Sequence, residues 1–241
     1  MARVALVTGG TRGIGASISQ ALKAAGCKVA ASYAGNDAAA QKFKADTGIP
    51  VYKWDVSSFD ACVAGVKQVE ADLAPVDVLV NNAGITRDGA FHKMTLEQWN
   101  AVINTNLGSL FNMTRQVIEG MRARKFGRII NISSINGQKG QMGQTNYSAA
   151  KAGVIGFTKA LALENAKKGV TVNCICPGYI DTEMVQAVPE NVLASIIGQI
   201  PVGRLGRGEE IADMVAFLAG EHAGYVTGST LSLNGGQYMA G

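Results

Sequence analysis

The chain has 241 residues, of which 47% are hydrophobic, and its Lys and Arg exceed its Asp and Glu by a net charge of +4. This length and composition suit one substantial core, so we expect a single domain spanning residues 1–241. The basic residues form no block and are not interleaved with aromatics, which argues against a nucleic-acid partner. A strand-like run begins within four residues of the start and no apolar run reaches about 18 residues, so we expect a cytoplasmic protein without a signal peptide or membrane span.

Short apolar runs alternate with longer helix-like stretches along the whole chain. The predicted strands lie near residues 4–7, 28–33, 51–54, 78–81, 128–132, 170–176 and 230–233. Strands that alternate with helices are typical of a parallel sheet covered by helices on both faces. The predicted fold class is therefore α/β, a single-domain Rossmann-like doubly wound parallel sheet.

The first predicted strand runs into a glycine-rich turn, Thr8-Gly9-Gly10-Thr11-Arg12-Gly13-Ile14-Gly15, before a helix-like segment at residues 17–25. Its glycines permit a tight turn, and the start of the helix offers N–H groups and partial positive charge to a pyrophosphate. The spacing Gly9-x3-Gly13-x-Gly15 differs from the common G-x-G-x-x-G. A plain connecting turn is the alternative. We predict a dinucleotide site formed by Gly9, Thr11, Arg12, Gly13, Ile14 and Gly15.

A phenol, an ammonium group and a hydroxyl form the second informative set. Tyr147 opens an Ala-rich, helix-like segment, so Lys151 lies one turn further along the same face. A nearby cation favours phenolate and lowers the phenol pKa from about 10 toward neutrality, which suits proton exchange. Ser134 follows the strand at residues 128–132, where its hydroxyl can donate to a substrate oxygen. The Tyr-x3-Lys spacing alone occurs by chance in many helices, but together with the glycine turn it indicates carbonyl reduction.

These motifs resemble the short-chain dehydrogenase/reductase family, and the resemblance runs from the first strand to the carboxyl end. Asn81-Asn82-Ala83-Gly84, Asn106 and Pro177-Gly178 also carry it. It implies a catalytic tetrad of Tyr147, Ser134, Lys151 and Asn106, with Asn106 holding a water that links Lys151 to solvent. It also implies cofactor contacts from Asp55, Val56, Asn82, Ala83, Gly84, Tyr147, Lys151, Pro177, Gly178, Ile180 and Thr182. Asp55 would accept from the adenine amino group, and a helix-capping role is an alternative or an addition.

The end of the second strand bears on the choice of cofactor. Relatives that prefer NAD carry an acidic residue there, which repels a 2′-phosphate. This chain has Ala31-Ser32-Tyr33-Ala34 instead. Arg12 can pair with a 2′-phosphate, and Ser32 and Tyr33 can add hydrogen bonds. We therefore expect NADPH, while Asp37, a few residues further on, leaves NADH open.

The stretch between Ser134 and Tyr147 is polar and contains three glutamines. Such a loop suits a substrate with several amide or carbonyl groups, for example a pantetheine arm. The stretch resembles the branch of the family that reduces acetoacetyl-CoA in polyhydroxybutyrate synthesis, and its sisters reduce 3-oxoacyl groups on acyl-carrier protein. The resemblance implies NADPH-dependent reduction of acetoacetyl-CoA to the (R)-3-hydroxyacyl-CoA. The expected substrate contacts are Gln141, Met142, Gln144 and Tyr179.

Two segments give further expectations. Residues 181–206 have a helix-like middle, a break at Pro201 and flanking glycines, which predicts a mobile substrate lid. The segment 147–163 is apolar nearly all round, which favours packing against another subunit over burial within one chain. The resemblance implies a homotetramer.

The remaining chemistry-bearing residues predict no metal site. The chain has four cysteines without a C-x-x-C pair and two isolated histidines: Cys27, Cys62, Cys174, Cys176, His92 and His222. A nucleotide-sensing regulator without catalysis is the alternative of another class. Such a regulator has no need for Ser134, Tyr147 and Lys151 together, so their joint presence favours an enzyme.

Overall fold

Seven parallel strands form one sheet, in the order β3-β2-β1-β4-β5-β6-β7. The computed structural model describes residues 2–186 and 188–239. The strands are β1 (Val4–Thr8), β2 (Lys28–Tyr33), β3 (Val51–Lys53), β4 (Val76–Asn81), β5 (Gly127–Ile132), β6 (Val170–Pro177) and β7 (Thr230–Leu233). All seven predicted strands are present, and the predicted fold class is confirmed.

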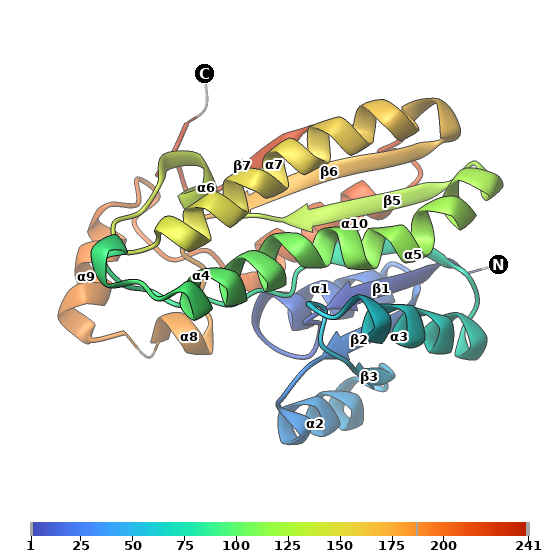
Figure 1. Cartoon of the computed structure of the whole chain (residues 1–241), viewed down its shortest axis with the longest axis horizontal. Coiled ribbons are helices and arrows are strands. Elements are labelled where there is room, and N and C mark those ends of the chain that lie inside the picture. The colour runs from blue at the N-terminus through green and yellow to red at the C-terminus, as the bar shows by residue number, and fades with distance from the viewer. Residues whose placement is uncertain (1, 187, 240–241) are drawn as a thin grey trace.

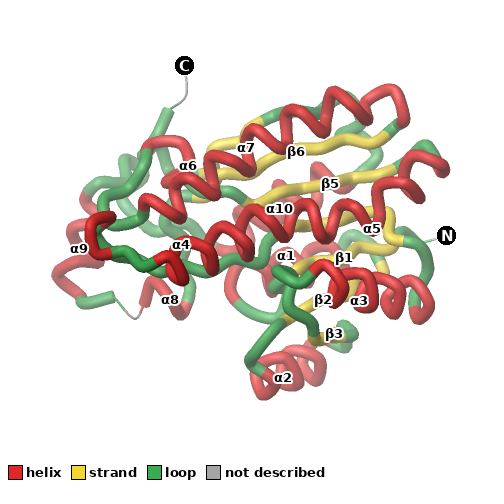
Figure 2. Tube along the Cα trace, viewed as in Figure 1, coloured by secondary structure: helices red, strands yellow, loops and turns green. Residues whose placement is uncertain are grey.

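Helices connect successive strands (Figures 1 and 2). The longer ones are α1 (Gly13–Ala24), α2 (Asp37–Thr47), α3 (Phe59–Asp72), α4 (Leu96–Ile103), α5 (Ser109–Arg124), α7 (Thr145–Asn165), α9 (Glu190–Gly198) and α10 (Gly208–Ala219). The short ones are α6 (Ile135–Lys139), α8 (Glu183–Gln186), the 3-10 turns η1 (Phe91–Lys93) and η3 (Ala166–Lys168), and the π-helical turn η2 (Asn104–Gly108). Polar caps define several starts, since Asn36 accepts from Ala39 N and Ser58 from Ala61 N.

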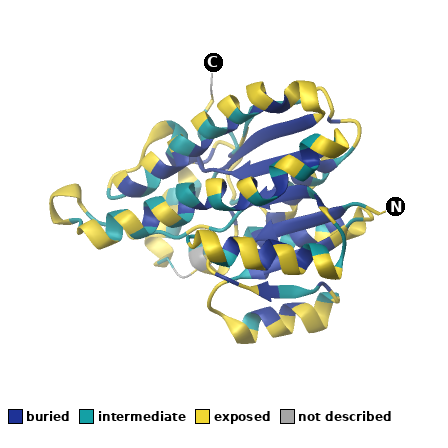
Figure 3. Cartoon of the chain, turned by 45° about the vertical axis from the view of Figure 1, so that its right-hand side comes forward, coloured by how far each residue is buried: buried dark blue, intermediate teal, exposed yellow. Residues whose placement is uncertain are grey.

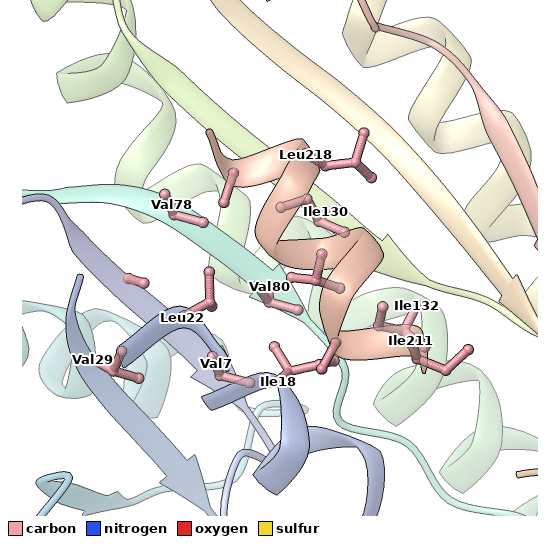
Figure 4. Packing of buried hydrophobic residues seen from close by; sticks show 14 of the residues in the cluster. Val7, Ile18, Leu22, Val29, Val78, Val80, Ile130, Ile132, Ile211 and Leu218 are labelled. Carbon is pink, nitrogen blue, oxygen red and sulfur yellow. The ribbon is translucent and has the colours of Figure 1, made fainter. Parts of the chain in front are cut away.

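The helices cover both faces of the sheet. On one face α1 and α10 pack on the strands, and Ile18, Leu22 and Leu218 belong to one buried cluster with Val7 and Val80 (Figure 4). On the other face the cluster draws on α3, α5 and α7. Figure 3 shows the strands as the most continuously buried part of the chain. Because both faces are covered, the strands read as nearly unbroken apolar runs, which is why they were predictable. Each fully buried Leu or Ile contributes about 1.5–3 kcal/mol to folding.

The connection geometry determines where a site can form. From β1 the chain builds β2 and β3 on one side and then crosses to β4 on the other side. In such sheets, ligands bind beyond the carboxyl ends of the strands, near this switch point. Figure 1 shows α4, α6, α8 and α9 together beyond one end of the sheet, at the left of the view. In the described part of the chain, no helix is long and apolar enough to span a membrane.

Candidate active site

The glycine turn after β1 is shaped by close packing. Gly9 and Gly13 have φ of +62° and +51°, which other residues rarely adopt. A Cβ at Gly15 would collide with the carbonyl of Gly9 and lie 2.6 Å from Asn82 Nδ2. Helix α1 starts at Gly13, four residues earlier than the predicted helix-like segment, so Gly13 and Gly15 form its first turn. That turn carries no acidic residue and no side-chain cap, which leaves N–H groups available to an anion.

Asn82 ties the end of β4 to this turn. Its Nδ2 donates to the carbonyls of Thr8 (2.9 Å) and Gly9 (3.2 Å). The Thr8 hydroxyl accepts from the backbone N–H groups of Asn82 and Ala83, both at 3.0 Å. The two strands at the switch point are thus clamped together, which keeps Ala83 and Gly84 beside the glycine turn.

The end of β2 holds a polar cluster that the sequence did not reveal. The hydroxyl of Tyr33 donates to Asp37 Oδ1 at 3.0 Å, and Lys53 Nζ lies 2.7 Å from Asp37 Oδ2. Lys53 holds the pKa of Asp37 below its usual range, so this carboxyl stays ionised and paired. The hydroxyl of Ser32 is buried without a partner among the described residues. Arg12 is exposed and caps nothing.

Asp55 and Val56 occupy the turn after β3. Asp55 Oδ1 accepts from the backbone N–H and the hydroxyl of Ser57, both at 2.8 Å. Ser58, not Asp55, caps helix α3, so the capping alternative for Asp55 is wrong. The carbonyl of Val56 accepts from Asn112 Nδ2 at 3.0 Å, which anchors the turn to α5.

The end of β6 leads back toward the glycine turn. Pro177 is its last residue, and Gly178 lies where a Cβ would be 2.8 Å from the Cα of Asn234. Ile180 pairs with Gly206, which brings together the two ends of residues 181–206. A Cβ at Gly13 would be 3.7 Å from Thr182 Cγ2, so Thr182 lies against the start of α1.

The structure brings Ser134, Tyr147 and Lys151 together. Ser134 follows β5, and its Oγ accepts from Asn136 N at 3.1 Å as the N-cap of α6. Tyr147 and Lys151 lie one turn apart on α7, with Lys151 Nζ 5.6 Å from the centroid of the phenol ring. Lys151 is 4% exposed, and its Nζ donates to the carbonyl of Ile132 at 2.8 Å. The structure therefore places a hydroxyl and a phenol, two groups that can act on a ketone oxygen, close to a buried ammonium group.

The pKa of each group follows from its burial. Burial raises the pKa of Tyr147, Ser134 opposes this by hydrogen bonding, and the Asp88 carboxylate adds to the rise. The predicted lowering of the Tyr147 pKa is absent here, because loss of solvation outweighs the hydrogen bond with Ser134. Burial lowers the pKa of Lys151 to about 8, against the opposing effect of Cys174 and Cys176. Lys151 is therefore still mainly a cation at neutral pH, and Tyr147 carries its proton.

Asn106 lies in the π-helical turn η2, where such turns often mark functional positions. Its Oδ1 accepts from Ile85 N and its Nδ2 donates to Ile85 O, both at 2.8 Å. A Cβ at Gly84 would lie 3.3 Å from Asn106 Oδ1 and 3.6 Å from Lys151 Nζ. The structure therefore places Asn106 near Lys151 and holds its side-chain amide by two hydrogen bonds to the backbone of Ile85.

The predicted substrate residues fall into three environments. Met142 is 95% exposed and Gln141 is also exposed, at the rim of the site. Tyr179 is half-buried and lines a cavity of about 620 Å³ together with Ile200 and Tyr238, a cavity that none of Ser134, Tyr147 and Lys151 lines.

Gln144 occupies the third environment, because both ends of its amide are held by the protein. Its Nε2 donates to Asp88 Oδ2 at 2.8 Å and its Oε1 accepts from Asn136 Nδ2 at 2.9 Å. These two bonds fix the orientation of the amide and leave one N–H proton and one oxygen lone pair for the expected contact with substrate.

Three residues at the site escaped sequence reasoning: Asp88, Asn136 and Asn146. Asn146 is fully buried, accepts from Tyr147 N at 2.8 Å and donates to Arg87 O at 3.0 Å, so it orients the start of α7. The only sequence signal was that an asparagine directly precedes the tyrosine. Asp88 and Asn136 gave no signal, because their role depends on Gln144, which lies 56 and 8 residues away from them.

The other reactive side chains do not form a metal centre. Within residues 2–186 and 188–239, no group of three His, Cys, Asp or Glu side chains is placed to hold an ion. Cys174 and Cys176 lie on the same face of β6, with their sulfurs 4.0 Å apart, as expected of residues two apart on a strand.

A parallel sheet with a glycine turn after β1, beside a buried Ser-Tyr-Lys group, matches the family that the sequence resembles. The family model described as enoyl-(acyl carrier protein) reductase matches residues 9–237. The chain belongs to the short-chain dehydrogenase/reductase family. Acetoacetyl-CoA reductases of this family use a nicotinamide cofactor.

Three relatives show how similar the chain is to individual members of the family. The chain is 74% identical over 99% of its length to the whole of a protein of Shinella zoogloeoides named acetoacetyl-CoA reductase. It is 71% identical over its full length to the whole of a Rhizobium meliloti protein of the same name. It is 46% identical, over 98% of each chain, to the 3-oxoacyl-[acyl-carrier-protein] reductase of Escherichia coli.

Proposed function

We propose that this chain reduces short 3-oxoacyl-CoA thioesters, with acetoacetyl-CoA as the main substrate, to (R)-3-hydroxyacyl-CoA with NADPH. The observation that carries the proposal is the convergence of Ser134, Tyr147 and Lys151 beside the glycine turn, in a chain whose 74% and 71% identical relatives are named acetoacetyl-CoA reductase. The names of these full-length relatives favour reduction of a ketone over the enoyl reduction named by the family model.

The residues of this chain fit a nicotinamide dinucleotide. The glycine turn has no room for side chains at Gly15, and the first turn of α1 presents free N–H groups to a pyrophosphate. The unpartnered Ser32 hydroxyl and the exposed Arg12 suit a 2′-phosphate, and Lys53 neutralises Asp37 nearby. These features support NADPH over NADH. When bound, the cofactor supplies the hydride.

The side chains act on the ketone oxygen. The Ser134 oxygen accepts from Asn136 N, so its own proton remains for the Tyr147 oxygen or, once substrate is bound, for the ketone oxygen. The raised pKa of Tyr147 keeps its proton in place at neutral pH, as an acid for reduction requires. As negative charge develops on the substrate oxygen, Ser134 and Tyr147 stabilise it by hydrogen bonds and Tyr147 transfers its proton. The Lys151 ammonium group then stabilises the phenolate, and Asn106 supports the return of a proton from solvent.

Three features of the chain support the rest of the proposal. Helix α9 has no buried residue, and Val192 on it is 44% exposed, which suits a role of residues 181–206 as a lid that closes over the substrate. Phe111 on α5 and Leu163 on α7 are 58% and 85% exposed, which suits burial in a homotetramer. The four cysteines are free, which suits the reducing cytoplasm.

The second candidate is reduction of 3-oxoacyl groups on acyl-carrier protein, favoured by the 46% identical Escherichia coli relative. A third candidate is a nucleotide sensor without catalysis. The buried ammonium group beside a phenol does not support it, because a sensor has no need for this pair. The test is NADPH oxidation by the purified protein with acetoacetyl-CoA, followed by chiral analysis of the product. We expect rapid oxidation and the (R) product. No turnover with acetoacetyl-CoA, or turnover with acetoacetyl-carrier protein alone, would contradict the proposal.

A further inference from the structure

Two segments meet near Tyr147, one loop at residues 85–90 after β4 and one at residues 140–146, which ends in the first turn of α7. Three hydrogen bonds join them: Gly89 N to Gly143 O at 2.8 Å, Asn146 Nδ2 to Arg87 O at 3.0 Å, and Gln144 Nε2 to Asp88 Oδ2 at 2.8 Å. The first two use backbone groups of one or both loops. The third is a bond between side chains, and it continues further into the site.

The chain of bonds runs from Asp88 to the Ser134 hydroxyl. Gln144 Oε1 accepts from Asn136 Nδ2 at 2.9 Å, and the backbone N–H of Asn136 donates to Ser134 Oγ at 3.1 Å. Asn136 is 9% exposed and lies in the first turn of α6, while Gln144 lies directly before α7 and three residues before Tyr147. One path therefore connects the loop after β4, the serine after β5 and the helix that carries the tyrosine.

The carboxylate of Asp88 determines the direction of every amide on this path. A carboxylate only accepts hydrogen bonds, so the Gln144 NH₂ group must face Asp88 and its oxygen must face Asn136. The Asn136 NH₂ group then faces Gln144, which leaves Asn136 Oδ1 buried without a partner among the described residues. A buried acceptor without a partner is unfavourable, so the orientation of Asn136 is imposed through Gln144 and does not arise from its own surroundings.

We propose that Asp88, Gln144 and Asn136 form a positioning relay that holds the Ser134 hydroxyl in register with the Tyr147 phenol. Gln144 then serves the reaction by orienting Asn136 and the two loops. The inference rests on the proposed reductase activity, and it holds for any ketone that reaches Ser134 and Tyr147.

The test reverses the donor and acceptor order of the relay. In Gln144→Glu, two carboxylates face each other and the donor to Asp88 is lost. We expect kcat to fall about 10- to 100-fold, the size of effect that a misplacement of about 1 Å produces. Adding Asp88→Asn restores complementarity, because the new amide at position 88 donates to the new carboxylate at position 144, which still accepts from Asn136. The double variant should therefore be more active than Gln144→Glu, by about tenfold.

The matched control is Gln138→Glu, in the neighbouring helix α6. Gln138 is bonded to the hydroxyl of Ser232 at 2.9 Å, and a hydroxyl can donate to a carboxylate as well as to an amide oxygen. We expect this control to stay within about twofold of the parent enzyme. NADPH binding, followed by the change in its fluorescence, should be the same in all four proteins.

Two substrates separate positioning from contact, namely acetoacetyl-CoA and ethyl acetoacetate, which lacks the coenzyme. A positioning relay predicts that Gln144→Glu lowers kcat in the same proportion for both substrates. The proposal is overturned if the double variant is no more active than Gln144→Glu, or if Gln144→Glu raises KM for acetoacetyl-CoA alone. A parent enzyme that reduces ethyl acetoacetate but not the thioester would contradict the proposed function and still allow the relay to be judged.

Discussion

The cofactor side and the substrate side of the site are built differently. On the cofactor side, hydrogen bonds between side chains and backbone groups join Thr8, Asn82 and the glycine turn, and there is no room for a Cβ at Gly15. On the substrate side, Met142 is 95% exposed and α9 has no buried residue. Segments with few buried contacts open at low cost. We therefore propose that the reaction takes place at the rigid edge of the sheet, and that selection of the substrate belongs to the less buried segments.

The largest expected effect removes the acid on the rigid side. In Tyr147→Phe the ring stays but the proton donor is lost, so kcat should fall about 10²- to 10⁴-fold. NADPH binding should be largely retained, because the glycine turn is unchanged. Steady-state kinetics and cofactor fluorescence measure the two effects separately. Near-normal turnover would refute the role of the phenol.

Gly15→Ala tests the rigidity of the glycine turn on the cofactor side. The added methyl group would meet the Gly9 carbonyl and Asn82 Nδ2, so the turn must open. We expect NADPH affinity to fall about 100-fold or more, a loss typical of a displaced binding backbone. Gly35→Ala is the matched control, since a Cβ there meets nothing within 4 Å. Equal NADPH affinity in the two variants, measured by titration calorimetry, would contradict the rigid half of the comparison.

Lys151 lies between the cofactor side and the substrate side, and its burial makes the free energy of unfolding depend on pH. Burial lowers its pKa from 10.5 to about 8, so between these values the unfolded chain binds more protons than the folded chain. Its contribution to the free energy of unfolding therefore rises with pH across that window, and below about pH 8 the buried cation carries its full cost.

Replacing this lysine with an apolar side chain should remove that cost. Lys151→Met should be the more stable protein at pH 7, by up to a few kcal/mol, and its advantage should shrink as the pH approaches 10. Urea unfolding of both proteins at several pH values measures the difference. A difference that does not vary with pH would show that the ammonium group is not desolvated.

The sequence anticipated the rigid side better than the mobile side. The strands were predictable because both faces of the sheet are covered, so their apolar runs are unbroken. The sequence revealed Ser134, Tyr147 and Lys151 because their placement depends on local structure. Ser134 follows the end of one strand, and Tyr147 and Lys151 lie one turn apart on one helix. Gln144 was predicted to contact substrate, yet Asp88 and Asn136 engage its amide. These hydrogen bonds depend on how two loops pack together in the fold, and a local sequence pattern cannot predict that packing. The Tyr147 pKa was also misjudged, because burial is a property of the assembled fold.

A smaller effect concerns the phosphate of the cofactor. Arg12→Ala should raise KM for NADPH about tenfold and leave KM for NADH nearly unchanged, because a charge-assisted hydrogen bond to a 2′-phosphate is lost. Comparing kcat/KM for the two cofactors measures this. Equal losses for NADPH and NADH would place Arg12 at the shared pyrophosphate instead.

The most direct measurement of the central claim is a parallel determination of kcat/KM for acetoacetyl-CoA and acetoacetyl-carrier protein, with NADPH in excess. The proposed function predicts efficient reduction of acetoacetyl-CoA and a clearly lower kcat/KM for the protein-bound substrate. A higher kcat/KM for acetoacetyl-carrier protein would contradict it and would assign the chain to the alternative reaction.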